Sequence, residues 1–279
     1  MIVHANVMVK DESIILPHVF KYWNEYPIDK WVFYNDNSVD NTTEVIQNNF
    51  GDRAVVFESK ESNFSESRNR STMLEHSREA GADLVLAIDA DELLSSNLLQ
   101  KWEDVTNLCM VKDLQLYWFN VVGDINTIRQ DPMYVDNYRT FFVSLKDCEK
   151  FDMSLYKYHT PRLPAINLPK VWTKDVGVIH LQSINKRFYA LKQLWYKHYE
   201  IVTWNHSPMY INSRYDPVVN NLNFNEARIP SEIVGDIEFD ATIYDKIERS
   251  KRYLDFIKQN YRPELVTFGK EYVEIDHGV

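Results

Sequence analysis

Short apolar runs alternate with stretches of helical spacing through the first 95 residues. Apolar runs of four to eight residues are typical of strands buried on both faces, and apolar positions three and four residues apart are typical of helices that cover a sheet. The expected strands are 2–9, 31–34, 54–57 and 84–88, and the expected helices are 14–23, 41–50 and 65–80. This order predicts an α/β fold with a mostly parallel sheet, helices on both faces and right-handed crossovers.

The alternation weakens after residue 104. We expect strands at 114–122, 138–145 and 176–181, an irregular extended stretch at 156–166, an aromatic helix at 185–204, a loop over 205–240 and a closing helix at 241–261. The predicted organisation is a main domain over 1–204 and a C-terminal helical extension over 205–279 that packs on it.

Polar segments follow three of the expected strands, at 10–13, 35–40 and 89–92. The carboxyl ends of parallel strands share one edge of the sheet, so these segments are expected to meet where ligands bind. Asp89 and Asp91 are two positions apart and can converge on one point just past the strand end. Adjacent carboxylates favour a hard cation such as Mg²⁺ or Mn²⁺ between them. The competing interpretation is that they solvate a turn or cap the next helix.

Composition narrows the class of protein. The 279 residues are 44% hydrophobic and carry a net charge of −10, which suits one large domain with a core and disfavours nucleic acid as a partner. The two cysteines, Cys109 and Cys148, are far apart and indicate a reducing compartment. No signal peptide or transmembrane helix is expected. The predicted location is therefore the cytoplasm, as a soluble protein, with peripheral membrane association left open.

Four short motifs occur in order at the ends of the expected elements: Val9-Lys10-Asp11-Glu12, the turn over 34–42, Ser67-Arg68-Asn69, and Ile88-Asp89-Ala90-Asp91-Glu92-Leu93. Together they resemble the nucleotide-sugar glycosyltransferases of GT-A fold, especially the family-2-like branch, whose metal motif is Asp-x-Asp. The later run Gly177-Val178-Ile179-His180-Leu181 resembles a strand of the family whose histidine is a further metal ligand. The Gln-x-x-Arg-Trp motif of processive synthases is missing, so we expect transfer of one sugar or a few.

The resemblance implies a Mn²⁺ or Mg²⁺ cofactor that bridges the diphosphate of the donor as a Lewis acid. Its expected ligands are Asp91, Asp89 and His180, with Asp89 contacting either the ribose or the metal. The candidate donor-binding residues are Val9, Lys10, Asp36, Arg68, Asp89, Ala90 and Lys186. Three of these roles have a structural alternative: an Asx turn for Asp36, a surface ion pair for Arg68, and ordinary hydrogen bonds at a strand end for His180.

An inverting reaction also needs a base that deprotonates the acceptor hydroxyl. Asp124 and Asp131 follow the strand at 114–122 and are the candidates, beside the interpretation that each is a loop carboxylate. A retaining reaction would need no base in that place. We expect inversion, but the sequence alone does not distinguish an inverting reaction from a retaining one.

The sequence therefore predicts a metal-dependent hexosyl- or deoxyhexosyltransferase. Its donor would be a nucleotide-diphospho-sugar, expected to be UDP-linked, and its acceptor a hydroxyl on a glycan, a lipid-linked or a protein-linked substrate. One rival is a sugar nucleotidyltransferase, but residues 9–12 lack the glycine-rich phosphate loop that it needs. The others are a glycoside hydrolase that uses Asp89 and Asp91, and a non-catalytic binding module.

Overall fold

The computed structural model describes residues 1–59, 65–132, 134–146, 148, 161–219 and 224–265. The chain divides into two compact units. The first unit comprises Met1–Phe119, Asp136–His180 and Ile229–Glu238, and the second comprises Asn120–Val135, Leu181–Arg228 and Phe239–Val279. The predicted domain boundary at residue 205 stays a prediction.

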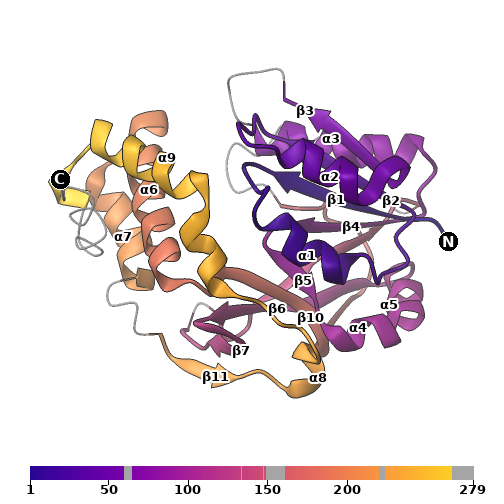
Figure 1. The fold of residues 1–279 in the computed structure, drawn as a ribbon. Helices are drawn as coiled ribbons and strands as arrows, with labels where there is room; N and C mark the ends of the chain where they lie inside the picture. The colour runs from indigo at the N-terminus through magenta and orange to yellow at the C-terminus, as the bar shows by residue number, and fades with distance from the viewer. Residues whose placement is uncertain (60–64, 133, 147, 149–160, 220–223, 266–279) are drawn as a thin grey trace. The chain divides into compact units, whose positions relative to one another are not determined.

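The first unit is built on a largely parallel sheet, in which the strand order is β3-β2-β1-β4-β9 (Figure 1). The four parallel strands are β1 (Val3–Val9), β2 (Lys30–Asn35), β3 (Ala54–Glu58) and β4 (Leu84–Asp89). At one edge β9 (Phe142–Ser144) pairs with β4 in the antiparallel direction. The α/β fold class predicted from the sequence is confirmed.

Helices cover both faces of this sheet. Alternate residues of β2 point to opposite faces and pack against different helices. Trp31 lies on the side of α1 (Leu16–Trp23) and α2 (Thr42–Phe50), and its ring centroid is 5.0 Å from that of Phe50. Val32 and Tyr34 face the other side, where they pack with Met73 of α3 (Glu66–Glu79). Each helix therefore buries its apolar stripe on one face of the sheet.

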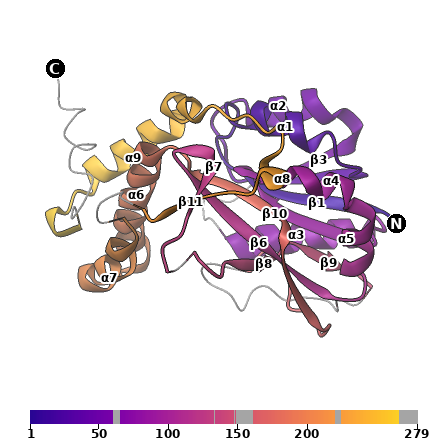
Figure 2. The same ribbon diagram turned by 90° about the horizontal axis from the view of Figure 1, so that it is seen from below.

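The remaining elements of the first unit extend it beyond β4. They are β5 (Glu92–Leu94), α4 (Ser96–Gln100), α5 (Trp102–Cys109), β8 (Tyr138–Thr140), α8 (Ser231–Val234) and most of β6 (Asp113–Val122) and β10 (Lys170–Ser183). β5 pairs with β10 and β8 pairs with β6, both antiparallel. Helices α4 and α8 lie side by side (Figures 1 and 2). The strand predicted at 138–145 is therefore two strands, β8 and β9, in different sheets.

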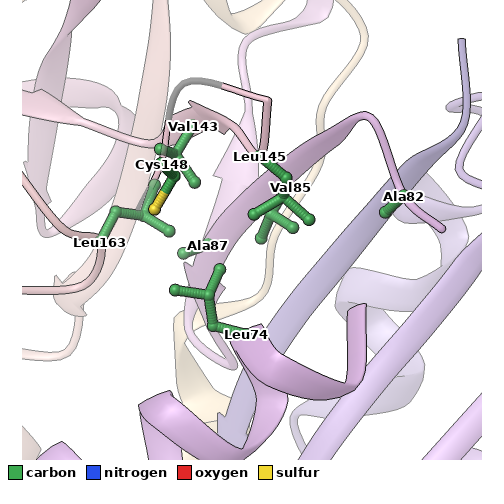
Figure 3. Packing of buried hydrophobic residues seen from close by; sticks show 8 residues of the cluster. All are labelled: Leu74, Ala82, Val85, Ala87, Val143, Leu145, Cys148 and Leu163. Carbon is green, nitrogen blue, oxygen red and sulfur yellow. The ribbon is translucent and has the colours of Figure 1, made fainter. Parts of the chain in front are cut away.

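A hydrophobic cluster lies between α3, β4 and the chain around β9 (Figure 3). Its buried members are Leu74, Ala82, Val85, Ala87, Val143, Leu145, Cys148 and Leu163. Leu163 belongs to a segment without regular structure, so this cluster fixes that segment against the sheet. The rest of the irregular stretch predicted at 156–166, residues 156–160, lies outside the described residues.

The second unit holds β7 (Asp124–Arg129) and β11 (Glu226–Arg228), which pair antiparallel, and a group of helices. These are α6 (Lys186–Trp204), α7 (Pro208–Val219), the 3-10 helix η3 (Ala241–Lys246), α9 (Glu248–Gln259) and η4 (Pro263–Leu265). The aromatic helix predicted at 185–204 is confirmed as α6, whose Trp195 ring stacks on that of Tyr253 at 4.6 Å. The closing helix breaks at Ile247, which has an extended backbone. The predicted C-terminal helical region is confirmed.

The loop predicted over 205–240 is wrong, since α7, β11 and α8 lie there. Pro208 opens α7, at a position where proline is compatible with a helix. Ile211 and Tyr215, four residues apart, form a buried stripe that packs with Ile201 and Leu265. No helix of the described chain is long and apolar enough to cross a membrane.

Candidate functional site

The strand order reverses beside β1, because β2 and β3 lie on one side of it and β4 returns to the other. In open α/β sheets such a reversal opens a ligand site beyond the carboxyl ends of the strands. Val9 of β1 is level with Asn35 of β2, and Met8 is level with Asp89 of β4. The polar segments that follow these strands are therefore brought to one edge, as the sequence predicted.

The loops that follow β1 and β2 are locked together by hydrogen bonds. Three consecutive backbone N–H groups after β1 donate to side-chain oxygens of the other loop: Asp11 to Ser38 at 2.8 Å, Glu12 to Thr42 at 2.8 Å, and Ser13 to Asp40 at 3.1 Å. In return, the Val39 N–H donates to Asp11 Oδ1 at 2.8 Å, which holds Asp11 in its left-handed conformation with a φ of 53°. These three amides are committed to the protein and do not form a phosphate-binding cradle.

Asp36 is 3% exposed and lies at the end of β2. Its Oδ2 accepts a hydrogen bond from Lys10 Nζ at 2.8 Å, and its Oδ1 has no hydrogen-bond partner among the described residues. The turn-forming role considered for Asp36 is instead performed by two neighbours. Asn35 accepts from the Ser38 N–H at 3.0 Å, and Asp40 accepts from the Thr42 N–H at 3.1 Å.

Glu92, which follows the Asp-x-Asp motif, is the first residue of β5 and is fully buried. It accepts hydrogen bonds from the Asp89 N–H at 2.8 Å, from Trp118 Nε1 at 2.7 Å, and from both terminal nitrogens of Arg162. Burial raises the pKa of Glu92 while Arg162 opposes that rise. Because every one of these contacts donates to the carboxylate, we assign it the ionised form.

Asp89 lies between two arginines. Arg162 Nη2 is 2.8 Å from its Oδ2, and Arg70 Nη2 is 3.4 Å from its Oδ1. Burial opposes ionisation of Asp89, but the two guanidinium groups outweigh it and hold the pKa of Asp89 below its usual range. Arg70 also binds Glu66, one helical turn earlier in α3, at 2.9 Å. At neutral pH Asp89 is therefore a charged hydrogen-bond acceptor.

Asp91 and His180 form the second half of the cluster. Asp91 Oδ2 is 3.6 Å from His180 Nε2, and both residues are buried, with exposures of 9% and 4%. The imidazole stacks on the Trp118 indole with ring centroids 4.3 Å apart and planes at 17°. His180 is also level with Glu92 where β10 pairs with β5. The sequence-predicted pair of Asp91 and His180 is thus brought together by this strand pairing.

The residues at this cluster fit a divalent cation. Four carboxylates face two guanidinium groups, which leaves two negative charges: the carboxylates are Glu66, Asp89, Asp91 and Glu92, and the cations are Arg70 and Arg162. One carboxylate oxygen and one imidazole nitrogen suit Mn²⁺. Within the described ranges no group of three or more His, Cys, Asp or Glu side chains is arranged to hold a metal. Asp91 and His180 would therefore need oxygens of a ligand or water to complete a coordination sphere.

The other sequence-predicted residues are placed as follows. The Val9 carbonyl accepts from the Asp36 N–H at 2.9 Å, Ala90 is buried beside the two aspartates, and the Arg68 N–H donates to the cap residue Ser65 at 3.4 Å. Their donor-binding roles stay predictions.

Three more candidates belong to the second unit, and each has a partner there. Lys186 pairs with Glu226 at 2.9 Å, Asp124 accepts from Thr127 at 3.0 Å, and Asp131 accepts from two nitrogens of the buried Arg129 at 2.8 and 3.0 Å. The predicted roles of Asp124 and Asp131 as a base and of Lys186 on the diphosphate stay predictions.

Sequence reasoning missed Arg70, Arg162 and the role of Trp118. Glu66 and Arg70 are four residues apart in a predicted helix, and this spacing could have suggested the ion pair. Arg162 comes from an irregular segment 73 positions after Asp89, and no local pattern connects the two.

Comparison with known proteins gave no matching family model and no matching curated protein. Among solved structures, S. aureus TarS is similar with 13% identity and a TM-score of 0.45 over 79% of this chain, which spans 43% of the TarS chain. TarS 1–349 in complex with UDP has 11% identity and a TM-score of 0.47, covering 79% of this chain and 71% of the other. The inositol-1-phosphate CTP transferase from T. maritima has 11% identity and a TM-score of 0.41, covering 68% and 94%. The fold and the site described above follow from this chain's own topology and contacts.

Proposed function

We propose that this chain is a metal-dependent glycosyltransferase that moves one sugar from a UDP-sugar to a hydroxyl acceptor, with inversion. The observation that carries the proposal is that Asp36 and Asp89 lie at the ends of β2 and β4, on either side of β1, and that Asp91, just after β4, lies beside His180 of β10. A reversal of this kind binds nucleotides in other α/β sheets. Here Asp36 is a buried hydrogen-bond acceptor for a nucleotide base, and Asp89 is a charged acceptor. Asp91 and His180 are ligands for a divalent ion.

Each residue has a role in this proposal. Asp36 Oδ1 accepts from the N3–H of uracil, while Lys10, which donates to Asp36 Oδ2, brings a positive charge toward the diphosphate. Asp89, fixed by two guanidinium groups, accepts from a ribose hydroxyl. Asp91 and His180 hold Mn²⁺ or Mg²⁺. When bound, the metal supplies Lewis-acid stabilisation of the leaving diphosphate.

The locked loops argue against the nucleotidyltransferase alternative. A nucleotidyltransferase cradles the phosphates of a nucleoside triphosphate with free backbone amides after the first strand. Here the amides of Asp11, Glu12 and Ser13 donate to side chains of the neighbouring loop.

Product analysis tests the proposal. The protein is incubated with Mn²⁺ and a panel of nucleotide sugars, with water as the acceptor of the sugar, and release of free nucleoside diphosphate is measured. A parallel reaction with UTP and sugar 1-phosphates measures pyrophosphate. We expect UDP release from at least one UDP-sugar, at least about 100-fold slower in Asp91→Asn, whose metal ligand is weakened. Asp104→Asn, at an exposed carboxylate of α5, is the matched control. Pyrophosphate release without UDP release would instead identify a nucleotidyltransferase.

A further inference from the structure

Four planar side chains contact one another beside the acidic cluster: Phe141, Arg162, Trp118 and His180. The Arg162 guanidinium carbon lies 5.1 Å from the centre of the Trp118 ring and 5.1 Å from that of Phe141. On Trp118 the next member is the His180 imidazole, 4.3 Å away between ring centroids. The stack therefore links the guanidinium to a proposed metal ligand.

Hydrogen bonds hold the Arg162 and Trp118 side chains to Glu92. Arg162 and the Trp118 N–H both donate to this fully buried carboxylate, and Arg162 also reaches Asp89. Burial lowers the pKa of Arg162, but Asp89 and Glu92 outweigh that effect and raise it, so the guanidinium keeps its charge. One side chain thus supplies the counter-charge for two carboxylates.

Packing of the next residue, Leu163, places Arg162 at this position. The next residue, Leu163, is buried in the cluster with Leu74, Val85 and Val143 (Figure 3). The apolar neighbour fixes the segment to the sheet, and Arg162 has a side-chain exposure of only 13%. Ordering a long polar side chain costs conformational entropy. The charged hydrogen bonds that Arg162 makes offset this cost.

We propose that Arg162 is a positioning residue for the metal site: together with Glu92 and Trp118 it fixes the Asp89 carboxylate and the orientation of the His180 ring. This inference rests on the proposed function, because it concerns His180, a proposed metal ligand, and Asp89, the proposed ribose acceptor beside it. Replacing a residue that orients a metal ligand, without itself binding the metal, commonly changes metal affinity by 10–100-fold.

Direct measurement of Mn²⁺ binding tests the inference without relying on turnover. Free Mn²⁺ is titrated by electron paramagnetic resonance in the presence of UDP, for the wild type and for Arg162→Lys. Lysine keeps the positive charge but cannot bind two carboxylates with a planar fork. We expect roughly 10–100-fold weaker Mn²⁺ binding in Arg162→Lys. Trp118→Phe removes the N–H that binds Glu92 and keeps a ring beside His180, so it should weaken Mn²⁺ binding in the same direction.

Two control variants separate positioning from general loss of stability. Ile46→Ala removes buried methyl groups from α2, on the face of the sheet opposite α3, and should lower the melting temperature with unchanged Mn²⁺ affinity. Arg139→Gln removes another cation near the same indole, 5.6 Å from its centre, and should also leave Mn²⁺ affinity unchanged. If Arg162→Lys and Trp118→Phe both bind Mn²⁺ as the wild type does, or if Ile46→Ala weakens binding equally, the inference is overturned. A wild type that binds no Mn²⁺ with UDP would instead overturn the proposed function itself.

Discussion

Replacing Thr42 with valine would unlock the two loops that carry Lys10 and Asp36. Thr42 is fully buried at the start of α2. Its hydroxyl accepts from the Glu12 N–H at 2.8 Å and donates to Asp40 Oδ1. Valine has nearly the same shape, so the change removes both hydrogen bonds with little change in packing volume.

The expected loss of stability follows from these two bonds. A buried N–H left without a partner costs about 1–3 kcal/mol, and a hydrogen bond to a charged group contributes about 1.5–3 kcal/mol. Because the loops can relax, we expect a combined loss of about 2–4 kcal/mol in the free energy of unfolding. At roughly 2–4 °C per kcal/mol for a chain of this size, the melting temperature should fall by about 4–16 °C.

The loss should also depend on pH. Burial raises the pKa of Asp40, but hydrogen bonds from Thr42 and Ser13 outweigh it and hold the pKa below its usual range. A carboxylate with a lowered pKa in the folded state contributes stability above its ordinary pKa of about 4, and this contribution is lost as the pH falls through the lowered value. The difference between wild type and Thr42→Val should therefore be largest at neutral pH and shrink below about pH 4.

Urea unfolding between pH 3 and pH 7 measures both effects. Thr42→Ser is the matched control, because it keeps the hydroxyl and should retain most of the hydrogen-bond contribution. Calorimetric titration with UDP should show weaker binding to Thr42→Val, since Lys10 and Asp36 lie on the unlocked loops. A difference from wild type below about 0.5 kcal/mol at pH 7, or one that stays constant down to pH 3, would refute the reasoning.

Two further predictions concern the core. Gly177→Ala should destabilise the chain by more than about 2 kcal/mol in urea unfolding. A Cβ there would lie 2.3 Å from the Tyr117 carbonyl oxygen, which strand β6 holds in place. Stability equal to that of the wild type would contradict the packing described. Burial raises the pKa of Cys109 to about 12 and also raises that of Cys148, so neither thiol should react with Ellman's reagent at pH 8 until the chain is denatured; rapid labelling of the native protein would contradict this.

Much of the first half of the fold was predictable because local and long-range preferences agree there. The apolar run before Asp89 is too regular and too short for anything but a buried strand, and it forms β4. The helix expected to begin at Ser65 forms α3, and the Ser65 side chain caps it by accepting from the Arg68 N–H. Asn185 caps α6 in the same way, through the Phe188 N–H. Once the strands alternate with helices, the meeting of polar segments at one edge follows from topology alone.

The rest could not be predicted because it depends on tertiary contacts. Glu92 reads as one of three acidic residues, and only the fold shows that it is the buried acceptor for Arg162 and Trp118. Arg162 occupies an irregular segment whose position is set by the burial of Leu163. Helix α7 was missed because its proline suggested a loop, although proline suits the first turn of a helix.

The most direct test of the proposed site is the thermal stability of the protein with UDP, with and without Mn²⁺, for wild type, Asp91→Asn and Asp104→Asn. A ligand that binds only the folded state raises its stability, by about 2.7 kcal/mol at 100 times the dissociation constant. We predict a rise in melting temperature with UDP that is enlarged by Mn²⁺ in the wild type and in Asp104→Asn, and a Mn²⁺-dependent part that is lost in Asp91→Asn. No rise with UDP or any other nucleoside diphosphate, or an equal Mn²⁺-dependent rise in Asp91→Asn, would contradict the proposed site.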